Sequence, residues 1–236
     1  MTPTQNTNLT LRTSNSTRPV LDRLLPEFER ATGHKVTLIL DTAKNSLARI
    51  KAGERADVAV LLGTSVDELA TMGVLVDASR QPFARSTIGI GVLQGAPKPD
   101  ISTVDAFKRA LLNAKSIAHT VHGPSGAYFP GLIERLGIAD QVKPKTVTRP
   151  GGYIGVVVTA GEAEMAFQQI CELLAVPGIE VVGPIPEAIQ YNFDSKAAIF
   201  AESSHQDAAR ALLRYFARAE HAAKFTAAGL GQLGIA

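Results

Sequence analysis

The stretch "LTLRTSNSTRPVLDRLLPEFERATGHKVTLIL", residues 9–40, decides the class of fold. Its first five residues predict a short strand, and the apolar spacing that follows predicts a helix over residues 18–31. Gly33 should end this helix, and "KVTLIL" (35–40) predicts the next strand. A strand, a helix and a second strand in this order form the unit from which parallel sheets are built.

The same alternation continues along the chain. We expect further strands at 56–62, 87–93, 116–121, 163–169, 179–185 and 196–202, and helices at 45–53, 66–73, 103–113, within 122–137, and at 151–161, 205–220 and 221–229. The pattern predicts an α/β fold with a parallel sheet covered by helices on both faces. Turn-rich segments near 77–86 and 184–195 are the candidate crossovers between two parts of the chain.

Composition excludes several classes of protein. The chain has 236 residues, 45% hydrophobic and 19% charged, which is typical of a globular protein with a sizeable core. A net charge of +2 without a Lys/Arg run argues against a nucleic-acid or membrane-surface partner. Cys171 is the single cysteine and the five histidines lack HExxH spacing, so we expect no metal and no cofactor.

Motifs for nucleotide binding and for known enzyme classes are missing. "GLGQLG" (229–234) fits the dinucleotide-binding pattern by letter, but it lies too near the end of the sequence to open a βαβ unit, so we interpret it as a turn. No P-loop, GxSxG elbow or kinase motif is found. The sequence alone therefore does not indicate an enzyme.

The compartment has two possible interpretations. The opening "MTPTQNTNLTLRTSNS" holds no apolar stretch of signal-peptide length, and no segment approaches the length of a membrane span. The protein is expected in the cytoplasm if Met1 is the native start, and in the periplasm if an export signal has been removed. We expect no insertion into the membrane.

A possible anion site lies in "HGPSGAYFPGLIERLG", residues 122–137. Apolar residues at helical spacing follow Ser125, which is a natural N-cap, and the glycines allow another group close to the backbone. The free N–H groups and positive dipole end of a helix attract anions. An ordinary capped helix and an anion site both fit this stretch.

Four segments together resemble a known family. They are residues 9–40, "LARIKAGERADVAVLLGTSVDELATMGVL" (47–75), "GPSGAYFPGLIERLG" (123–137) and "VVTAGEAEMAFQQI" (157–170). In this order they resemble the type II periplasmic binding proteins, within the molybdate-binding-protein-like branch. Each segment is weakly specific, but the collinear set covers nearly the whole chain.

The resemblance implies two α/β lobes joined by two crossover strands, with a ligand in the cleft between them. On this sequence residues 1–84 with 195–236 would form lobe 1, and residues 85–194 lobe 2. Several helix N-termini could then converge on one anion, and closure of the hinge would trap it. The helix after Ser125 is accordingly expected to be an anion clamp.

The resemblance also implies which residues contact the ligand. They follow the strands of both lobes: Ser14, Asn15, Ser16, Lys44, Asn45, Thr64, Ser65, Ser125, Gly126, Ala127, Tyr128, Gly152, Tyr153 and Gln168. Gln168 and Gln169 stand where the molybdate binders carry a tyrosine; they face opposite sides of a strand, so at most one should touch the ligand.

Cationic side chains depart from the neutral donors of the molybdate binders. Lys44 adds a positive charge, and Arg18, Arg85 and His122 are further candidates. Charge-assisted hydrogen bonds from such groups suit carboxylates. We therefore expect an organic di- or tricarboxylate rather than molybdate.

Two functions remain open at this point. A monomeric solute-binding protein would hold the anion without chemistry and, if exported, would serve an ABC transporter. An isomerase on the same scaffold would move the double bond of an unsaturated tricarboxylate such as aconitate, with Lys44, His122 or Tyr128 moving the proton. Lys44 on an exposed loop could equally be a solvated surface charge.

Overall fold

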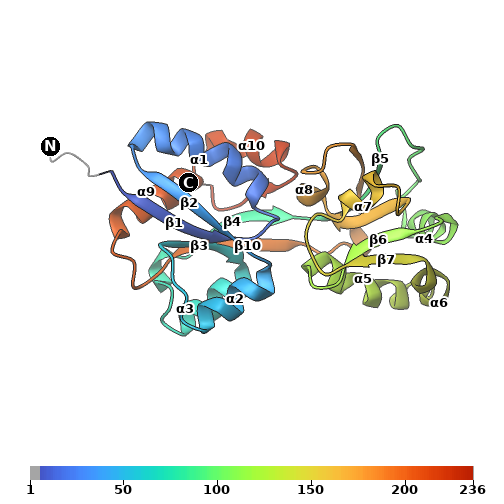
Figure 1. The fold of residues 1–236 in the computed structure, drawn as a ribbon, viewed down its shortest axis with the longest axis horizontal. Coiled ribbons are helices and arrows are strands. Elements are labelled where there is room, and N and C mark those ends of the chain that lie inside the picture. Colours follow the sequence, from blue (N-terminus) through green and yellow to red (C-terminus); the bar gives the residue numbers. More distant parts are fainter. Residues whose placement is uncertain (1–5, 236) are drawn as a thin grey trace. The chain divides into compact units, whose positions relative to one another are not determined.

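The computed structural model describes residues 6–235 and divides the chain into two compact units. Unit 1 comprises the residues up to Arg85 together with those from Asp194 onward, and unit 2 is the continuous segment Ser86–Phe193. The chain passes from one unit to the other in two strands, β4 (Gln81–Ser86) and β10 (Phe193–Ile199). The predicted α/β class and the two crossover strands are thus confirmed (Figure 1).

Unit 1 is built on a six-stranded sheet in the order β11-β4-β10-β3-β1-β2. The remaining strands are β1 (Asn8–Thr13), β2 (Lys35–Leu40), β3 (Val58–Leu62) and β11 (Gly231–Gln232). β1 runs parallel to β2 and β3, but β10 is antiparallel to β3 and β11 to β4. The expectation of a parallel sheet was wrong here, because β10 enters directly from unit 2 and needs no helical crossover to pair with β3.

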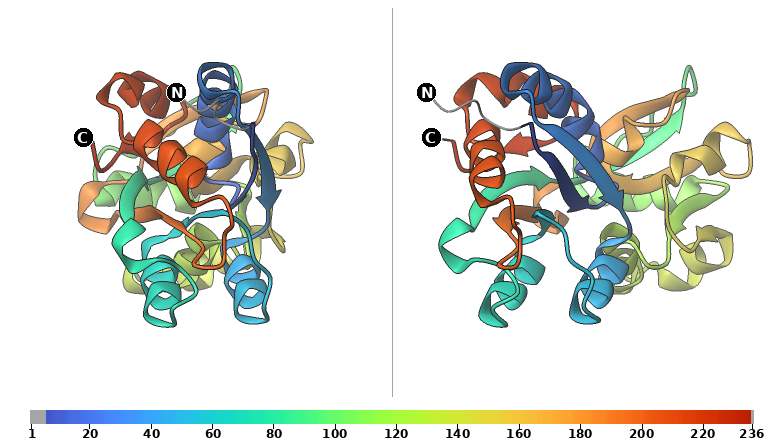
Figure 2. Two further views of the ribbon diagram at one scale, coloured as in Figure 1. Left: turned by 90° about the vertical axis from the view of Figure 1, so that its left-hand side faces the viewer. Right: turned by 60° about the vertical axis from the view of Figure 1, so that its left-hand side comes forward.

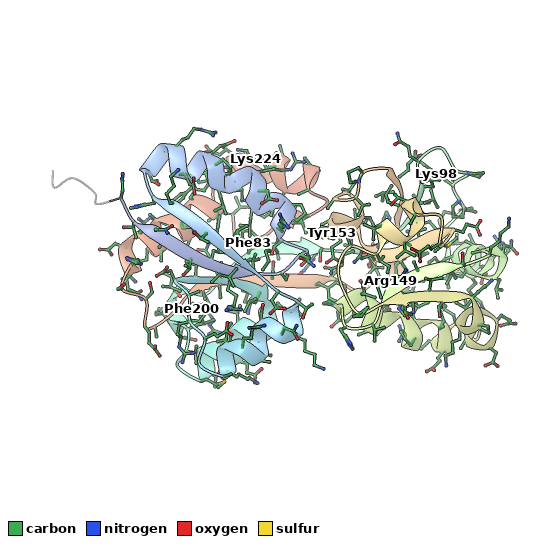
Figure 3. All side chains as sticks on the ribbon, viewed as in Figure 1. Phe83, Lys98, Arg149, Tyr153, Phe200 and Lys224 are labelled. Atoms are coloured by element: carbon green, nitrogen blue, oxygen red, sulfur yellow. The ribbon has the colours of Figure 1, made fainter. Side chains whose placement is uncertain are left out.

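Helices cover both faces of this sheet. α1 (Arg18–Thr32), α9 (Gln206–Phe216) and α10 (Ala222–Ala227) lie on one face, and α2 (Ala43–Lys51) and α3 (Gly63–Thr71) on the other (Figures 1 and 2). Short 3₁₀ turns form η1 (Asp77–Ser79) and η4 (Ala219–His221). Phe83 packs edge-on against two aromatic rings of the first face, and Phe200 belongs to the apolar cluster of the second (Figure 3).

Unit 2 holds a five-stranded sheet in the order β7-β6-β8-β5-β9. Its strands are β5 (Ile88–Leu93), β6 (Ile117–Thr120), β7 (Thr146–Arg149), β8 (Met165–Gln169) and β9 (Ile179–Pro184). β6 is parallel to β7 and β8, whereas β5 is antiparallel to β8 and β9. This sheet is also mixed, so the expectation of a parallel sheet was wrong in both units.

The helices of unit 2 pack on its two faces as well (Figure 1). They are α4 (Val104–Asn113), α5 (Pro124–Arg135), α6 (Ala139–Val142), α7 (Gly155–Thr159) and α8 (Ile170–Leu173), with the 3₁₀ turns η2 (Lys143–Lys145) and η3 (Glu187–Ile189). Phe129 of α5 and Phe167 of β8 pack with their rings tilted by 50° and ring centres 4.6 Å apart. A second cluster, which includes Val157 and Leu173, fills the face under α7 and α8.

Several elements differ from the prediction. The turn-rich segment near 77–86, a candidate crossover, forms the strand β4 over most of its length. The helix expected at 151–161 shrinks to α7, because Gly152 has φ +89° and the loop continues past it. "GLGQLG" was expected to be a turn, and it also contributes β11, which pairs with β4. Among residues 6–235, no helix is long and apolar enough to cross a membrane.

Candidate functional site

Three helices of unit 1 begin at the same edge of its sheet. Thr13 at the end of β1 lies level with Leu40 of β2 and Val60 of β3, so the carboxyl ends of the three parallel strands coincide. α1, α2 and α3 start just beyond these ends. We call residues 14–17, 42–46 and 63–65 the unit 1 edge. Such an edge gathers positive dipole ends and free N–H groups, which attract anions.

The loop before α1 is held by its own hydrogen bonds. The carbonyl of Ser14 accepts the backbone N–H groups of Thr17 and Arg18, each at 3.3 Å, and Ser14 Oγ lies 3.0 Å from Ser16 Oγ. Thr17 precedes the helix, but its hydroxyl pairs with Thr13 Oγ1 at 2.5 Å. No side chain among residues 6–235 caps α1. Ser14, Asn15 and Ser16 are half-buried.

The first turn of α2 contains an exposed lysine and a buried serine hydroxyl. Thr42 caps the helix by accepting the backbone N–H of Asn45 at 3.2 Å. Lys44 is exposed, and its ammonium has no hydrogen bond or ion pair with any residue that the structure describes. Ser46 is fully buried, and its Oγ has no partner within the described part of the chain. A buried hydroxyl without a partner is costly, so Ser46 Oγ is a candidate hydrogen-bond donor to a ligand.

α3 follows its strand without an intervening loop. It begins at Gly63, directly after Leu62, and within residues 6–235 no side chain caps it. Thr64 is exposed and Ser65 is buried. The N–H groups of this first turn therefore have no side-chain acceptor from the described chain.

Unit 2 has a corresponding edge. Thr120 at the end of β6 lies level with Arg149 at the end of β7. The chain continues from these ends into α5 and into the loop before α7, and the N–H of His122 joins the two by donating to the Pro150 carbonyl at 3.0 Å. We call residues 120–128 and 150–154 the unit 2 edge. The His122 side chain is exposed and has no partner among the described residues.

The first turn of α5 lies unusually close to the end of β6. The N-cap is Gly123, so Ser125 was wrongly expected to cap this helix; it occupies the second helical position instead. A Cβ on Gly126 would lie 1.7 Å from the Thr120 carbonyl oxygen, and only glycine permits this approach. Ala127 follows on the exposed side of the helix.

Two hydroxyls are buried beneath this turn without partners. Ser125 is 1% and Thr120 is 2% exposed, and neither Ser125 Oγ nor Thr120 Oγ1 has a hydrogen-bond partner within residues 6–235. Sequence reasoning missed Thr120. The available signal was a hydroxyl residue at the end of a strand, shortly before two glycines that approach it.

Tyr128 and Gln168 are engaged within unit 2. The Tyr128 hydroxyl donates to the Ile189 carbonyl and accepts from Arg135 Nη2, both at 2.8 Å. Gln168 Oε1 accepts the Ile154 N–H and its Nε2 donates to the Gly152 carbonyl, again at 2.8 Å. Gln168 therefore fixes the loop of Gly152 and Tyr153, which Figure 3 shows ahead of α7.

The other cations proposed from the sequence are neutralised. Arg18 lies 3.4 Å from Asp22. Arg85 forms two hydrogen bonds of 2.7 Å to Asp194, so this pair joins the two crossover strands at the boundary of unit 1. Of the four basic residues that the sequence suggested, Lys44 and His122 are therefore the two available to bind a ligand.

A buried carboxyl that the sequence did not reveal lies in α8, directly after β8. Glu172 is 8% exposed, and burial raises the pKa of its carboxyl to about 8. Gln169 Nε2 donates to Glu172 Oε2 at 3.4 Å, while Gln169 Oε1 accepts from the Ser86 hydroxyl. Glu172 is therefore protonated at neutral pH.

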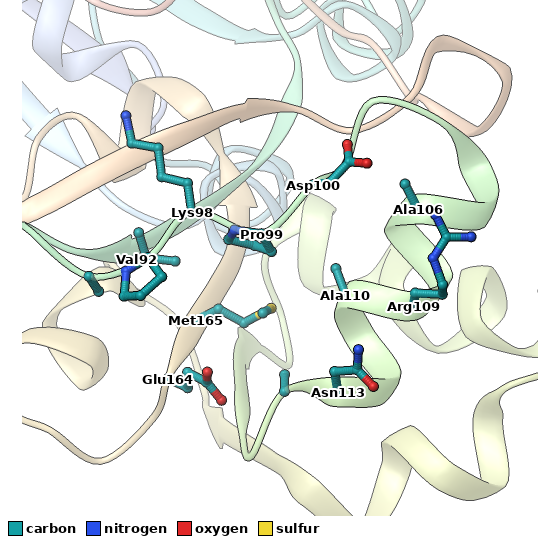
Figure 4. A pocket seen from close by; sticks show the side chains of 13 residues that line it. Val92, Lys98, Pro99, Asp100, Ala106, Arg109, Ala110, Asn113, Glu164 and Met165 are labelled. Atoms are coloured by element: carbon teal, nitrogen blue, oxygen red, sulfur yellow. The ribbon is translucent and has the colours of Figure 1, made fainter.

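Unit 2 also contains a cavity of about 410 Å³ that involves none of the predicted site residues (Figure 4). It lies between α4 and the start of β8, with Arg109 and Asn113 on the helix side and Met165 on the strand side. Lys98 on its rim pairs with Glu180 at 2.6 Å. Across the described chain, no group of His, Cys, Asp and Glu side chains is arranged to hold a metal ion.

Residues 9–231 match the family model described as bacterial extracellular solute-binding protein. The chain belongs to this family. Its members bind small solutes, are typically periplasmic and typically work with ABC transporters. The family and the type II periplasmic-binding-protein fold expected from the four sequence segments are confirmed.

The names of similar proteins indicate different activities and ligands. An aconitate isomerase from Pseudomonas sp is 36% identical over 230 residues, covering 95% of this chain and 87% of that protein. The Azotobacter vinelandii periplasmic molybdate-binding protein has a TM-score of 0.78 at 18% identity, covering 94% of this chain and 98% of that one. The sulfate-binding protein SubI from Mycobacterium tuberculosis has a TM-score of 0.74 at 18% identity, with 95% and 86% covered. The two solved structures share the fold.

Proposed function

We propose that this protein binds a small organic polyanion, a di- or tricarboxylate in preference to molybdate, and that the unit 1 edge and the unit 2 edge, each taken by itself, offer donors suited to such an anion. The observation that carries the proposal is the set of buried hydroxyls of Ser46, Thr120 and Ser125, which have no partner among the described residues. All three stand where a helix follows the end of a strand. Ligand oxygens would satisfy these hydroxyls together with the free N–H groups.

Charge favours carboxylates over a compact oxyanion held by neutral donors. Lys44 at the start of α2 and His122 at the start of α5 have no partners within residues 6–235, and they belong to different units. The ammonium of Lys44 and the ring N–H of His122 are hydrogen-bond donors that suit carboxylates. The 36% identity to an aconitate isomerase supports a tricarboxylate of the aconitate type. We place the protein in the periplasm, as is typical of the family, where it would serve an ABC transporter.

A ligand panel tests the proposal. We expect aconitate, citrate or succinate to raise the melting temperature at matched ionic strength, and molybdate to raise it far less. At a hundredfold excess over Kd the stabilisation is about 2.7 kcal/mol. Ser125→Ala or Lys44→Gln should weaken binding by about 10- to 100-fold, since a hydrogen bond to a charged group contributes roughly 1.5–3 kcal/mol.

The exposed Ser204 supplies the control, because Ser204→Ala removes a hydroxyl far along the sequence from either edge. Its ligand affinity should equal that of the unchanged protein. A larger stabilisation by molybdate than by any carboxylate would contradict the proposed ligand class.

Isomerisation of the bound acid is the second candidate function, and the aconitate isomerase relative favours it. In such a reaction a base takes a proton from the methylene carbon, the double bond moves by one position, and a proton is added to the former alkene carbon. Lys44 and His122 are the free groups that could transfer it, whereas the Tyr128 hydroxyl already has two partners.

Proton NMR in deuterium oxide separates the two candidates. If the protein is an isomerase, cis- and trans-aconitate should interconvert with deuterium uptake at carbon, and His122→Gln or Lys44→Gln should slow this by at least about 100-fold. Aconitate that binds tightly but stays unlabelled and unchanged would leave binding as the function and rule out the isomerase.

A further inference from the structure

A cationic cavity lies in unit 1. It has a volume of about 220 Å³ and is lined by the 76–81 segment, the end of β10 and one face of α9. Val76, Ile199 and Leu213 are its apolar lining residues, and Arg80, Arg210 and Arg214 are its cationic ones. The volume is below the roughly 300 Å³ at which pockets for drug-sized ligands begin, so a small ion or metabolite fits best.

The positive charge of this cavity is not balanced within unit 1. Arg80 and Lys196 are compensated by Asp67 and Asp77, at distances of 2.6–2.7 Å. Arg214 has no ion-pair partner among residues 6–235, and Arg210 has only Asp207 at 3.7 Å, whose side chain is fully exposed. We call Arg210 and Arg214 the α9 pair.

The α9 pair is unfavourable for the helix on its own. Arg210 and Arg214 are four residues apart on α9, so they lie one turn apart on the same face. Like charges at this spacing destabilise a helix by a few tenths of a kcal/mol. An anion between the two guanidinium groups would turn this repulsion into two charge-assisted interactions.

The third arginine is held in place. Arg80 Nη1 donates to Asp67 Oδ1 at 2.7 Å, and its Nη2 lies 2.6 Å from Asp77 Oδ1. Asp67 and Asp77 offset its charge, but a guanidinium fixed on two sides can offer its remaining N–H groups to a ligand without losing much side-chain entropy on binding. The cavity is therefore partly preorganised.

This cavity is separate from the unit 1 edge. Ile199, which lines it, pairs with Val58 at the start of β3, whereas the unit 1 edge follows Leu62 at the other end of that strand. The five residues of β3 span about 13 Å at the usual rise of a strand. A ligand here would occupy the opposite edge of the sheet.

We propose that the α9 pair and Arg80 bind a phosphate-type dianion, either inorganic phosphate or the phosphate of a small monoester. Guanidinium groups match tetrahedral oxyanions through pairs of N–H donors, and a dianion responds to two unbalanced charges more strongly than a single carboxylate does. The apolar surface of Val76, Ile199 and Leu213 leaves room for the carbon chain of a monoester.

Calorimetric titration at constant ionic strength tests this site, with inorganic phosphate and glycerol phosphate as probes. We expect both to bind, and Arg210→Gln/Arg214→Gln to weaken binding at least tenfold. Arg23→Gln/Arg30→Gln removes the same two charges from exposed positions on α1, and it should bind the probes as the unchanged protein does. Tighter binding of glycerol phosphate would identify a monoester as the ligand, and equal binding would identify phosphate itself.

Three results would overturn the proposal: neither probe binds, the α1 variant loses as much affinity as the α9 variant, or succinate binds to the α9 pair as tightly as phosphate. Aconitate binding should be unchanged in Arg210→Gln/Arg214→Gln. The phosphate site and the proposed carboxylate site can thus be disproved independently of each other.

Discussion

Replacing Gly126 by alanine should destabilise unit 2 by roughly 3 kcal/mol or more, or prevent it from folding. The new Cβ would lie 1.7 Å from the Thr120 carbonyl oxygen and 2.6 Å from Thr120 Oγ1, well inside van der Waals contact. The clash involves backbone on both sides, so no side-chain rotation relieves it. Urea unfolding followed by circular dichroism measures the loss as a lower midpoint.

Gly131 in the same helix provides the matched control. A Cβ at this position would have only Arg135 Nη1 nearby, at 3.6 Å, which is an ordinary contact. Gly131→Ala should leave stability unchanged or raise it by about 0.5–1 kcal/mol, because alanine favours the helix interior. Equal destabilisation by both substitutions would show that the close approach at Gly126 is not the cause.

Glu172→Gln should make unit 2 more stable at alkaline pH. The carboxyl has a pKa of about 8 in the folded protein against the usual 4.5, so the folded state binds more protons between these values. Stability from this group is therefore complete below pH 4.5 and falls as the pH rises through 8. At pH 8.5 the loss is roughly 3–5 kcal/mol, at about 1.4 kcal/mol per pKa unit. Glutamine has no proton to lose.

Urea unfolding at pH 5.5 and pH 8.5 compares the two proteins. We expect a small difference at pH 5.5 and a variant that is several kcal/mol more stable at pH 8.5. Glutamine keeps an oxygen that can accept from Gln169 Nε2, so the contact at this position survives. Glu187→Gln at an exposed position should change neither value. A Glu172→Gln variant that loses stability with pH as steeply as the unchanged protein would contradict the raised pKa.

Periodic elements were predictable because their pattern is local. The strand at 35–40 and the helix within residues 18–32 depend on apolar spacing and on Gly33, and both appear as expected. All four residues of β7 are partly buried or exposed. The strand therefore lacks the alternation of buried apolar and exposed polar residues from which a strand is predicted. The direction of β10 was missed because it depends on the path of the chain between units.

The candidate site was predictable in outline but not in its atoms. The loops after strands were identified from serine, glycine and lysine, and the structure places them at the two edges. Whether a hydroxyl is buried without a partner depends on packing by distant segments, so the glycines that follow Thr120 mark its position but do not show its burial. The hydrogen-bond partners of the Tyr128 hydroxyl come from η3 and from the end of α5. A sequence pattern cannot show that these two partners already engage it.

The sheet order of unit 1 constrains when the nascent chain can fold. β10 separates β3 from β4, so the open edge of β3 has no partner until residues 193–199 leave the ribosome. Unit 2 is continuous in sequence and can complete its sheet before then. Domains that finish early fold early, and unpaired strand edges invite aggregation. During synthesis the first three strands of unit 1 therefore keep an unpaired sheet edge for longer than any strand of unit 2.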